Sequence, residues 1–338
     1  MTRDIHDALV KTFFSQRRHA ASLFAALVPE SVARLTDWST LEPCPASFVD
    51  AAFGSHHADL LFVARQRGSR VPIYYHLEHQ STPERMLPCR AHGYRHGIWV
   101  QYRRLHPRSR WLPAIFTVVI YHGARRWKEP SDVRDLIRLR FQGARPALPS
   151  SPMIVEDLGS YPDARLRAKA RSAIAQLVLF CLRNARRSDL LERIRKGPQF
   201  FKRVMRQRDG PAAMETLVRY ILMANRSLDP AALAAAMKSQ IGEEAQKLVK
   251  TVGERLIERG ERKGLAKGRQ EGREEGRQKG LEEGLAYLRN ALLRLLYQRF
   301  GQVSERARKR IAAAPADQLA RWAERVLVAS SVQEVLSA

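Results

Sequence analysis

Cysteine, acidic residues and long apolar runs are all scarce in this chain of 338 residues. The three cysteines, Cys44, Cys89 and Cys181, lie far apart and form no C-x-x-C pair, so neither a disulfide framework nor a structural zinc site is expected. The longest apolar runs reach about half of the roughly 18 residues that a membrane span needs. Residues 1–4 lead into an amphipathic pattern instead of the apolar core of a secretory signal. We therefore expect a cytoplasmic protein with no membrane partner.

Acidic residues are outnumbered by basic ones, with 34 Asp and Glu against 59 Lys and Arg and a net charge of +25. An excess of this size favours nucleic acid or an anionic membrane surface as partner. Residues 90–145 hold 13 basic side chains against 3 acidic ones, and residues 183–208 hold 10 against 2. These windows are interpreted as phosphate-binding surfaces. The alternative is that they coat solvent-exposed faces. A membrane role has less support, because no amphipathic anchor accompanies them.

The apolar spacing predicts an α/β domain over residues 1–160. A helix is expected over 6–27, strands over 47–53, 59–65 and 71–80, a helix over 83–105 and a strand over 114–123. This order of helix, three strands, helix and strand predicts a compact fold with a mixed sheet.

Helical regions are expected to follow this domain. Residues 161–250 are predicted to be a helical extension without another strand, and residues 287–338 a small helical C-terminal domain. In the latter, Gly301 ends one helix, Ser304 caps the next and Pro315 precedes a third.

A candidate metal site lies on the two central predicted strands. Side chains two apart in a strand share a face, so Glu78 and Gln80 project together while His79 faces the other way and is expected to pack. If the strand beginning at Asp59 pairs with the next one through the turn between them, Asp59 comes near Glu78. Two carboxylates beside a polar group suit a hard cation such as Mg²⁺. In so basic a chain the natural substrate is a phosphodiester; the alternative is that both acids are solvated or salt-bridged.

Glycine recurs every four residues from Gly260 to Gly284, between charged residues of nearly balanced sign. In an exposed helix each glycine costs about 0.8–1.0 kcal/mol relative to alanine. A contact with a partner helix would offset this cost. Residues 251–286 are therefore interpreted either as a self-associating helical stalk, which makes the protein a homo-oligomer, or as a semi-helical linker.

Four segments resemble, in this order, the Rpn family of bacterial proteins, which are described as recombination-promoting nucleases or putative transposases of the YhgA-like group. They are HDALVKTFF at 6–14, ADLLF at 58–62, LEHQS at 77–81 and VIYHG at 119–123. The glycine repeat and the closing LLYQRFG at 295–301 resemble a C-terminal domain of unknown function that is often attached to such proteins. The resemblance implies a PD-(D/E)xK nuclease-like core, cleavage of DNA dependent on one or two Mg²⁺ ions, a link to recombination or mobile elements, and a cytoplasmic, nucleoid-associated location.

The resemblance also assigns roles by position. Asp59 matches the first metal-binding acid of the family and Glu78 the second. Gln80 matches the third catalytic position, which is lysine in most nucleases of this fold and glutamine in this group. An additional acid is expected at Asp7 or Asp50.

Glutamine cannot supply the positive charge of a lysine, so Gln80 is expected to orient the attacking water while the metal or an arginine stabilises the transition state. The arginine candidates for this role are Arg90 and Arg95. The candidates for DNA binding are Arg90, Arg95, Arg103 and Arg104.

Two rival functions remain open. The first is a DNA-binding, oligomerising, transposase-like protein whose nuclease core is weak or inactive. The second is an RNase-H-like transposase, which needs a further set of spaced carboxylates. Glu156, Asp157 and Asp163 are predicted to lie outside any strand, which disfavours the second.

Overall fold

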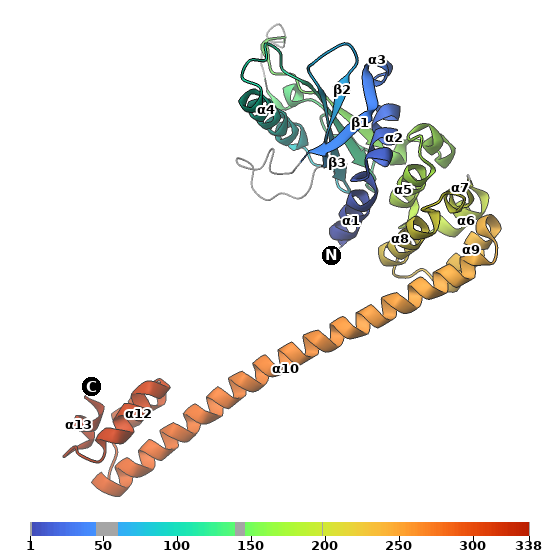
Figure 1. Cartoon of the computed structure of the whole chain (residues 1–338). Helices are drawn as coiled ribbons and strands as arrows, with labels where there is room; N and C mark the ends of the chain where they lie inside the picture. Colours follow the sequence, from blue (N-terminus) through green and yellow to red (C-terminus); the bar gives the residue numbers. More distant parts are fainter. Residues whose placement is uncertain (1, 45–59, 139–145, 198, 338) are drawn as a thin grey trace. The chain divides into compact units, whose positions relative to one another are not determined.

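The computed structural model describes residues 2–44, 60–138, 146–197 and 199–337 (Figure 1). The chain divides into two compact units, Met1–Leu256 and Ile257–Ala338. No helix among these described residues is both long and apolar enough to cross a membrane.

The chain begins with three helices: α1 (Thr2–Phe14), α2 (Arg17–Leu27) and α3 (Glu30–Leu35). The single helix expected over 6–27 is wrong, because Gln16 adopts an extended backbone and breaks it. Leu9 and Phe13 before the break and Leu23 and Phe24 after it are buried in the same core. Both helices therefore keep the same apolar spacing, which hides the break in the sequence.

Five strands form one mixed sheet in the order β1-β2-β3-β4-β5. They are β1 (Thr36–Cys44), β2 (Leu60–Gln66), β3 (Ile73–Gln80), β4 (Ala114–Tyr121) and β5 (Met153–Asp157). β1, β2 and β3 pair antiparallel, whereas β3–β4 and β4–β5 are parallel. Helix α4 (Leu87–Leu105) provides the crossover between β3 and β4 that a parallel pair requires. The expected mixed α/β architecture is confirmed.

Both edge strands differ from the prediction. The first strand expected, over 47–53, lies outside the described residues, and the chain instead forms β1 over Thr36–Cys44. Pro43 lies within β1, which is tolerated because an edge strand leaves some backbone N–H groups unpaired. The strand β5 includes Glu156 and Asp157, so the expectation that these acids lie outside any strand was wrong. Both are engaged locally: Glu156 binds Lys169 at 3.0 Å, and Asp157 accepts the backbone N–H of Trp127.

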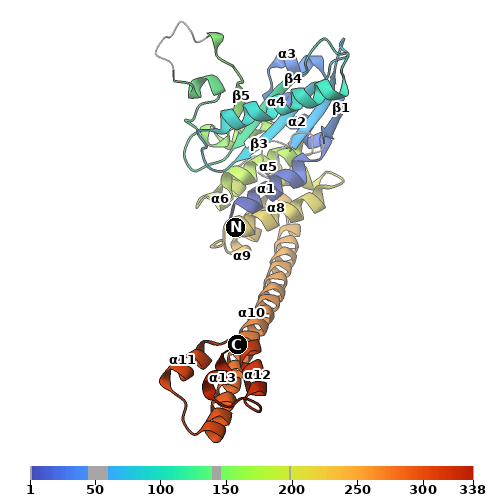
Figure 2. The ribbon, with the colours of Figure 1, turned by 90° about the vertical axis from the view of Figure 1, so that its left-hand side faces the viewer.

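The sheet is covered on both faces. On one face, α4 packs Ile98 and Tyr102 against Leu61, Tyr74 and Ile115. On the other, the buried residues of α1, α2 and α5 (Ala173–Asn184) share a core with Phe62, Tyr75 and Leu77. Figure 1 shows α4 on one side of the strands and α2 and α5 on the other, and Figure 2 shows α4 lying across the strands. The two faces of β3 therefore meet different helices.

Residues 161–250 are helical, as expected, and no strand follows β5 in the described part of the chain. Besides α5, the extension contains α6 (Leu190–Lys196), α7 (Phe200–Met205), α8 (Gly210–Ala224) and α9 (Pro230–Ile241). Short 3₁₀ turns, η2 (Val133–Leu136), η4 (Leu158–Ser160) and η5 (Asp163–Ala168), lie on either side of β5. The extension shares one apolar core with α1 and the sheet. The finer division of the sequence into four regions stays a prediction.

Helix α10 (Glu244–Phe300) is continuous over the glycine repeat. A Cβ added at any glycine of the repeat from Gly260 to Gly284 meets nothing within 4 Å, so no described part of the chain packs against these glycines. Self-association through them stays a prediction. Helices α11 (Glu305–Ala313), α12 (Ala316–Arg325) and α13 (Val332–Leu336) follow, around a core that includes Ile311 and Trp322. The three expected boundaries are confirmed: Gly301 has φ 78° after α10, the Ser304 hydroxyl accepts the N–H of Ala307, and Pro315 precedes α12.

Candidate active site

The carboxyl end of β3 brings Glu78 and Gln80 together on the face that α4 covers. Gln80 Nε2 donates to Glu78 Oε1 at 2.7 Å. Val119, the partner of Glu78 in the register of β4, packs against Leu87 and Ala91 of α4. Glu78 is 4% exposed and Gln80 3%. The expectation that these two side chains share a face is confirmed.

Arg90, in the first turn of α4, neutralises the buried carboxylate. Its Nη2 contacts Glu78 Oε1, and its Nη1 donates to Glu84 Oε1 at 2.6 Å. Burial alone would lower the pKa of Arg90, but the carboxylates of Glu78 and Glu84 outweigh burial and raise it. Arg90 therefore carries a fixed positive charge at the site.

Glu84 was missed in the sequence. It lies in the connection between β3 and α4, where no periodicity marks it. The sequence feature that could have identified Glu84 is its position between Glu78 and Arg90, in the segment that connects the strand to the helix.

His76 lies on the same face, two residues before Glu78. Its Nε2 is 3.8 Å from Glu78 Oε2, and its ring meets the ring of Tyr94 edge to face at 5.3 Å. Burial lowers the pKa of His76 to about 4, although the Glu78 carboxylate acts in the opposite direction. The imidazole is neutral at pH 7, whereas Arg90 contacts Glu78 as a cation.

The oxygen atoms of this site suit a hard cation. Gln80 Oε1 is buried and accepts no hydrogen bond from any residue that the structure describes. Beside it lies the carboxylate of Glu78, and Mg²⁺ typically takes one or two carboxylates together with waters and substrate oxygens. No cluster of three or more His, Cys, Asp or Glu side chains among the described residues is placed to hold a metal. Asp59 and Asp50 lie outside the described residues.

The other predicted acid, Asp7, lies on a helix that covers the face of the sheet opposite Glu78. It lies on α1 and forms an ion pair with Lys11 at 2.8 Å. Helix α1 packs on the face of the sheet opposite α4. A role for Asp7 as the additional acid stays a prediction.

The remaining arginine candidates occupy different environments along α4. Arg95 is 8% exposed and donates to the carbonyl of Pro152 at 3.1 Å, so a contact with DNA would require it to leave this bond. Arg103 and Arg104 are exposed in the last turn, where Arg103 donates to the carbonyl of Ser109. Of the four arginines, Arg90 contacts Glu78; the DNA-binding roles stay predictions.

A buried histidine cluster lies on the opposite face of the sheet. His79 Nε2 is 2.8 Å from His122 Nε2, the ring of His6 meets His122 edge to face at 4.8 Å, and His6 Nδ1 bonds the hydroxyl of Tyr220 at 2.8 Å. Burial lowers the pKa of His6 to about 4 and that of His122 well below 6.5. The cluster joins α1, β3, the residue after β4 and α8, which confirms that His79 points away from Glu78.

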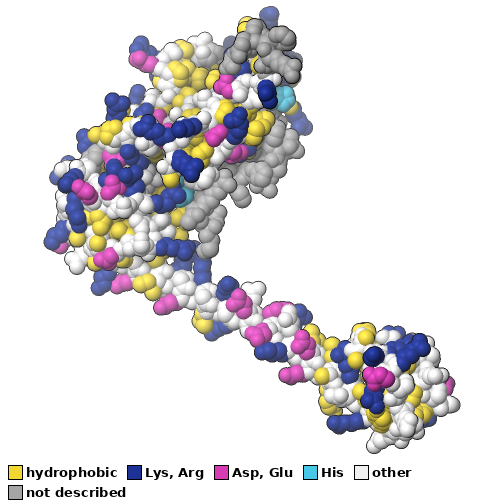
Figure 3. Space-filling model, turned by 180° about the vertical axis from the view of Figure 1, so that it is seen from behind, with side chains coloured by type: hydrophobic (Ala, Val, Ile, Leu, Met, Phe, Trp, Pro, Cys, Tyr) yellow, Lys and Arg dark blue, Asp and Glu magenta, His cyan; other side chains and the backbone are white. Residues whose placement is uncertain are grey.

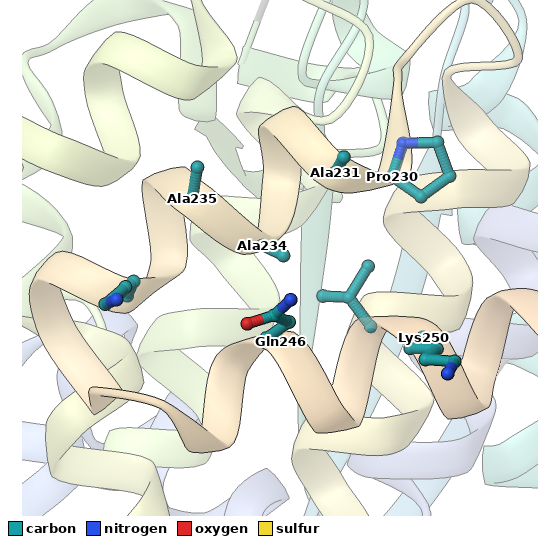
Figure 4. A pocket seen from close by; sticks show the side chains of 8 residues that line it. Pro230, Ala231, Ala234, Ala235, Gln246 and Lys250 are labelled. Atoms are coloured by element: carbon teal, nitrogen blue, oxygen red, sulfur yellow. The ribbon is translucent and has the colours of Figure 1, made fainter.

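A cavity of about 500 Å³ between α9 and the start of α10 is unrelated to this chemistry (Figure 4). Its wall consists of Pro230, three alanines and Val249, with Lys238, Gln246 and Lys250. This lining includes no carboxylate, histidine, serine or cysteine. We therefore assign no catalytic role to it.

The fold and the site define an α/β protein with a buried Glu–Gln pair, in contact with a half-buried arginine, at the carboxyl end of a central strand. Residues 4–211 match the model of the family described as "Putative transposase, YhgA-like", and the chain belongs to this family. The family expected from the sequence motifs is thereby confirmed.

Several curated proteins are similar to this chain. Recombination-promoting nuclease RpnD of Escherichia coli O157:H7 is 25% identical over 230 residues, which cover 64% of this chain and 81% of RpnD. Recombination-promoting nuclease RpnC of E. coli K12 is 24% identical over 196 residues, covering 56% of this chain and 62% of RpnC. The inactive recombination-promoting nuclease-like protein RpnE of E. coli K12 is 22% identical over 228 residues, covering 65% and 71%. No solved structure matches the chain significantly.

Proposed function

We propose that this protein is a Mg²⁺-dependent DNA endonuclease with a PD-(D/E)xK arrangement of Asp59, Glu78 and Gln80. The observation that carries the proposal is the pair at the end of β3: a buried carboxylate beside a buried amide whose Oε1 accepts no hydrogen bond from the described residues. Burying polar oxygen atoms in this way costs free energy unless a ligand binds them. A hydrated divalent cation offers hydrogen-bond donors to Gln80 Oε1 and a positive charge beside the Glu78 carboxylate.

The register of the sheet supports Asp59 as the second carboxylate. Leu60, at the start of β2, pairs with Leu77, the residue before Glu78. Chain connectivity joins Asp59 to Leu60 with a Cα–Cα distance of about 3.8 Å. In the sequence Asp59 directly precedes Leu60, just as Glu78 directly follows Leu77.

The residues of the proposed site have separate roles in the reaction. Bound Mg²⁺ supplies Lewis acidity and lowers the pKa of a bound water. Asp59 and Glu78 provide the carboxylate ligands, and Gln80 Oε1 accepts a hydrogen bond from the attacking water and so orients it. Arg90 provides the positive charge that Gln80 lacks. Two nitrogens of its guanidinium contact Glu78 and Glu84, and because the group has five N–H donors, others remain for the substrate.

The relatives support a nuclease and a second candidate. RpnD and RpnC are named recombination-promoting nucleases, which favours a link to recombination or mobile elements here as well. RpnE is named inactive. Because Glu78 is already paired with Arg90 and the third position is Gln80, the second candidate is a DNA-binding, oligomerising, transposase-like protein with weak or no cleavage.

Incubation of supercoiled plasmid with purified protein, in Mg²⁺ or in EDTA, separates the two candidates. The wild type should nick the plasmid only with Mg²⁺. Because removal of a group behind a metal ligand already costs about 10–100-fold, Glu78→Gln should lower the rate by at least about 100-fold. Glu192→Gln, a solvent-exposed glutamate on α6 in the same unit, is the matched control and should retain the wild-type rate.

DNA binding measured in parallel decides the remaining outcome. Tight binding with a steep salt dependence, but without Mg²⁺-dependent nicking by the wild type, would overturn the nuclease and support the DNA-binding candidate.

A further inference from the structure

Another cavity, of about 390 Å³, lies at the carboxyl end of β4. Its wall is formed by the loop that follows β4, by Gly159 after β5 and by the end of α5 with the residues after it. No acidic side chain lines it. The arginines of the wall are Arg125, Arg126, Arg183, Arg186 and Arg187.

The cavity joins the two basic windows of the sequence. Arg125 and Arg126 belong to the window over 90–145, and the other three arginines belong to the window over 183–208. The fold brings these windows together because β4 and α5 share a core, in which Ile120 packs with the apolar residues of α5. Figure 3 shows many Lys and Arg side chains on the visible face of the first unit, with fewer acids between them.

Two of the five arginines are neutralised by neighbouring carboxylates. Arg183 Nε is 3.0 Å from Asp163 Oδ1, and Arg187 Nε is 2.9 Å from Asp189 Oδ1. These pairs hold one side of the cavity in place, and Arg193 shares both carboxylates.

The other three arginines have no such counter-charge. No carboxylate of a described residue lies within 4.0 Å of the guanidinium nitrogens of Arg125, Arg126 or Arg186. His122, also in the wall, is buried and neutral, because its pKa lies well below 6.5. Three cations therefore share one concave site without an anion from the described chain, which is unfavourable until an anion enters.

The loop that carries Arg125 and Arg126 is fixed in place. The hydroxyl of Tyr121 donates to the carbonyl of Arg125 at 2.6 Å, and a Cβ at Gly123 would lie 2.0 Å from that hydroxyl. Only glycine therefore lets the chain pass so close to Tyr121. Arg186 Nη2 donates to the carbonyl of His122 at 3.3 Å and ties α5 to the same loop. The loop backbone at Arg125 and the guanidinium of Arg186 are thus held in place before any ligand binds.

We propose that this cavity, formed by Arg125, Arg126 and Arg186, binds a phosphate group of nucleic acid. Guanidinium groups suit phosphate because their planar N–H donors match its oxygens in pairs. Ligands of open α/β sheets also bind beyond the carboxyl ends of parallel strands, which is where this cavity lies.

The cavity adjoins the candidate active site. The backbone N–H of His122 donates to the carbonyl of Gln80 at 3.1 Å, so the two sites share one edge of the sheet. The choice of nucleic acid as the source of the phosphate rests on the proposed function. A phosphate held by the arginines would fix the strand while Glu78 and Gln80 face a different phosphate.

The test is equilibrium binding of a 3′-labelled single-stranded oligonucleotide, with and without a 5′-phosphate, measured by fluorescence anisotropy in EDTA. Arg186→Ala should weaken binding by about tenfold or more, because it removes a charge-assisted hydrogen bond. It should also reduce the slope of log K against log salt by about 0.7. Arg226→Ala, which removes an exposed arginine in the turn between α8 and α9, is the control and should change affinity less than twofold.

The two oligonucleotides identify which phosphate binds. Loss of a preference for the 5′-phosphorylated strand in Arg186→Ala supports a terminal phosphate, whereas equal loss for both strands supports an internal phosphodiester. Unchanged binding by Arg186→Ala and by Arg125→Ala/Arg126→Ala, or an equal loss in Arg226→Ala, would overturn the proposal. Circular dichroism of each variant must show the wild-type melting curve, and Arg186→Lys, which keeps the charge, should retain part of the affinity. EDTA removes cleavage from the measurement, so a failed nuclease assay leaves these results unaffected.

Discussion

Replacing Arg90 by methionine removes the cation that contacts the buried carboxylate of Glu78. The Glu78 side chain is 5% exposed, so water cannot replace the lost partner. Breaking a buried ion pair from one side costs about 3–5 kcal/mol, because the remaining charge is left uncompensated. We expect the lower end of this range, about 3 kcal/mol, because Gln80 still donates to Glu78 and methionine retains the apolar stem of the arginine.

Urea unfolding followed by circular dichroism, at pH 7.5 without Mg²⁺, measures this cost. Glu78→Gln in the Arg90→Met background removes the carboxylate charge that has lost its arginine. It should restore about 2 kcal/mol of the free energy of unfolding, since a buried amide costs far less than a buried carboxylate. Arg103→Met is the control: this arginine is exposed on the same helix, and the change should stay within about 0.5 kcal/mol. The reasoning is refuted if Arg90→Met and Arg103→Met cost the same, or if the double variant is less stable than Arg90→Met alone.

Three further predictions concern stability. Burial lowers the pKa of His6 and His19 to about 4, so below pH 6.5 the unfolded chain binds protons that the native protein cannot bind. Each histidine should therefore lower the free energy of unfolding by about 2 kcal/mol at pH 5 relative to pH 7.5. A free energy of unfolding in urea that does not change over this pH range would contradict the prediction. Gly268→Ala and Gly276→Ala should each stabilise α10 by about 0.8–1.0 kcal/mol, because an added Cβ meets nothing within 4 Å. If the variants instead lose their helical circular dichroism at a lower temperature than the wild type, the glycines contact a partner. Asp229→Ala should cost about 1 kcal/mol in thermal unfolding, because its carboxylate caps α9 through the N–H groups of Ala231 and Ala232, whereas Asp229→Asn should not.

The central strands could be predicted from the sequence because their signal is local. Alternation of two residues fixes which side chains share a face, so the contact between Glu78 and Gln80 follows from β3 alone. The strand β4 also carries a strong apolar pattern of its own. The helix ends at Gly301 and Ser304 were predictable for the same reason, since capping depends on one or two residues.

The rest depends on docking between distant segments. Arg90 reaches Glu78 only because α4 packs across the strand that precedes it, and no spacing in the sequence encodes that approach. His6 bonds Tyr220, 214 residues away, through the packing of α1 on α8. The cavity lined by Arg125 and Arg186 likewise requires the loop after β4 to meet the end of α5. The sequence showed the two basic windows, but not that they converge.

The edge strands were missed for a different reason. Such strands pair on one side only, so weaker patterns suffice to form them. β1 contains Pro43 and a shift of register between Asp37 and Glu42, both of which resemble loop features. β5 is 5 residues long and ends with Glu156 and Asp157.

Calorimetric titration of Mg²⁺ into the DNA-free protein tests the central claim most directly, because it reports the metal site without requiring cleavage. Wild type and Glu192→Gln should bind the ion with the same affinity, whereas Asp59→Asn and Glu78→Gln should each lose measurable binding. Binding by Asp59→Asn and Glu78→Gln that matches the wild type would contradict the assignment of these two carboxylates as the metal ligands.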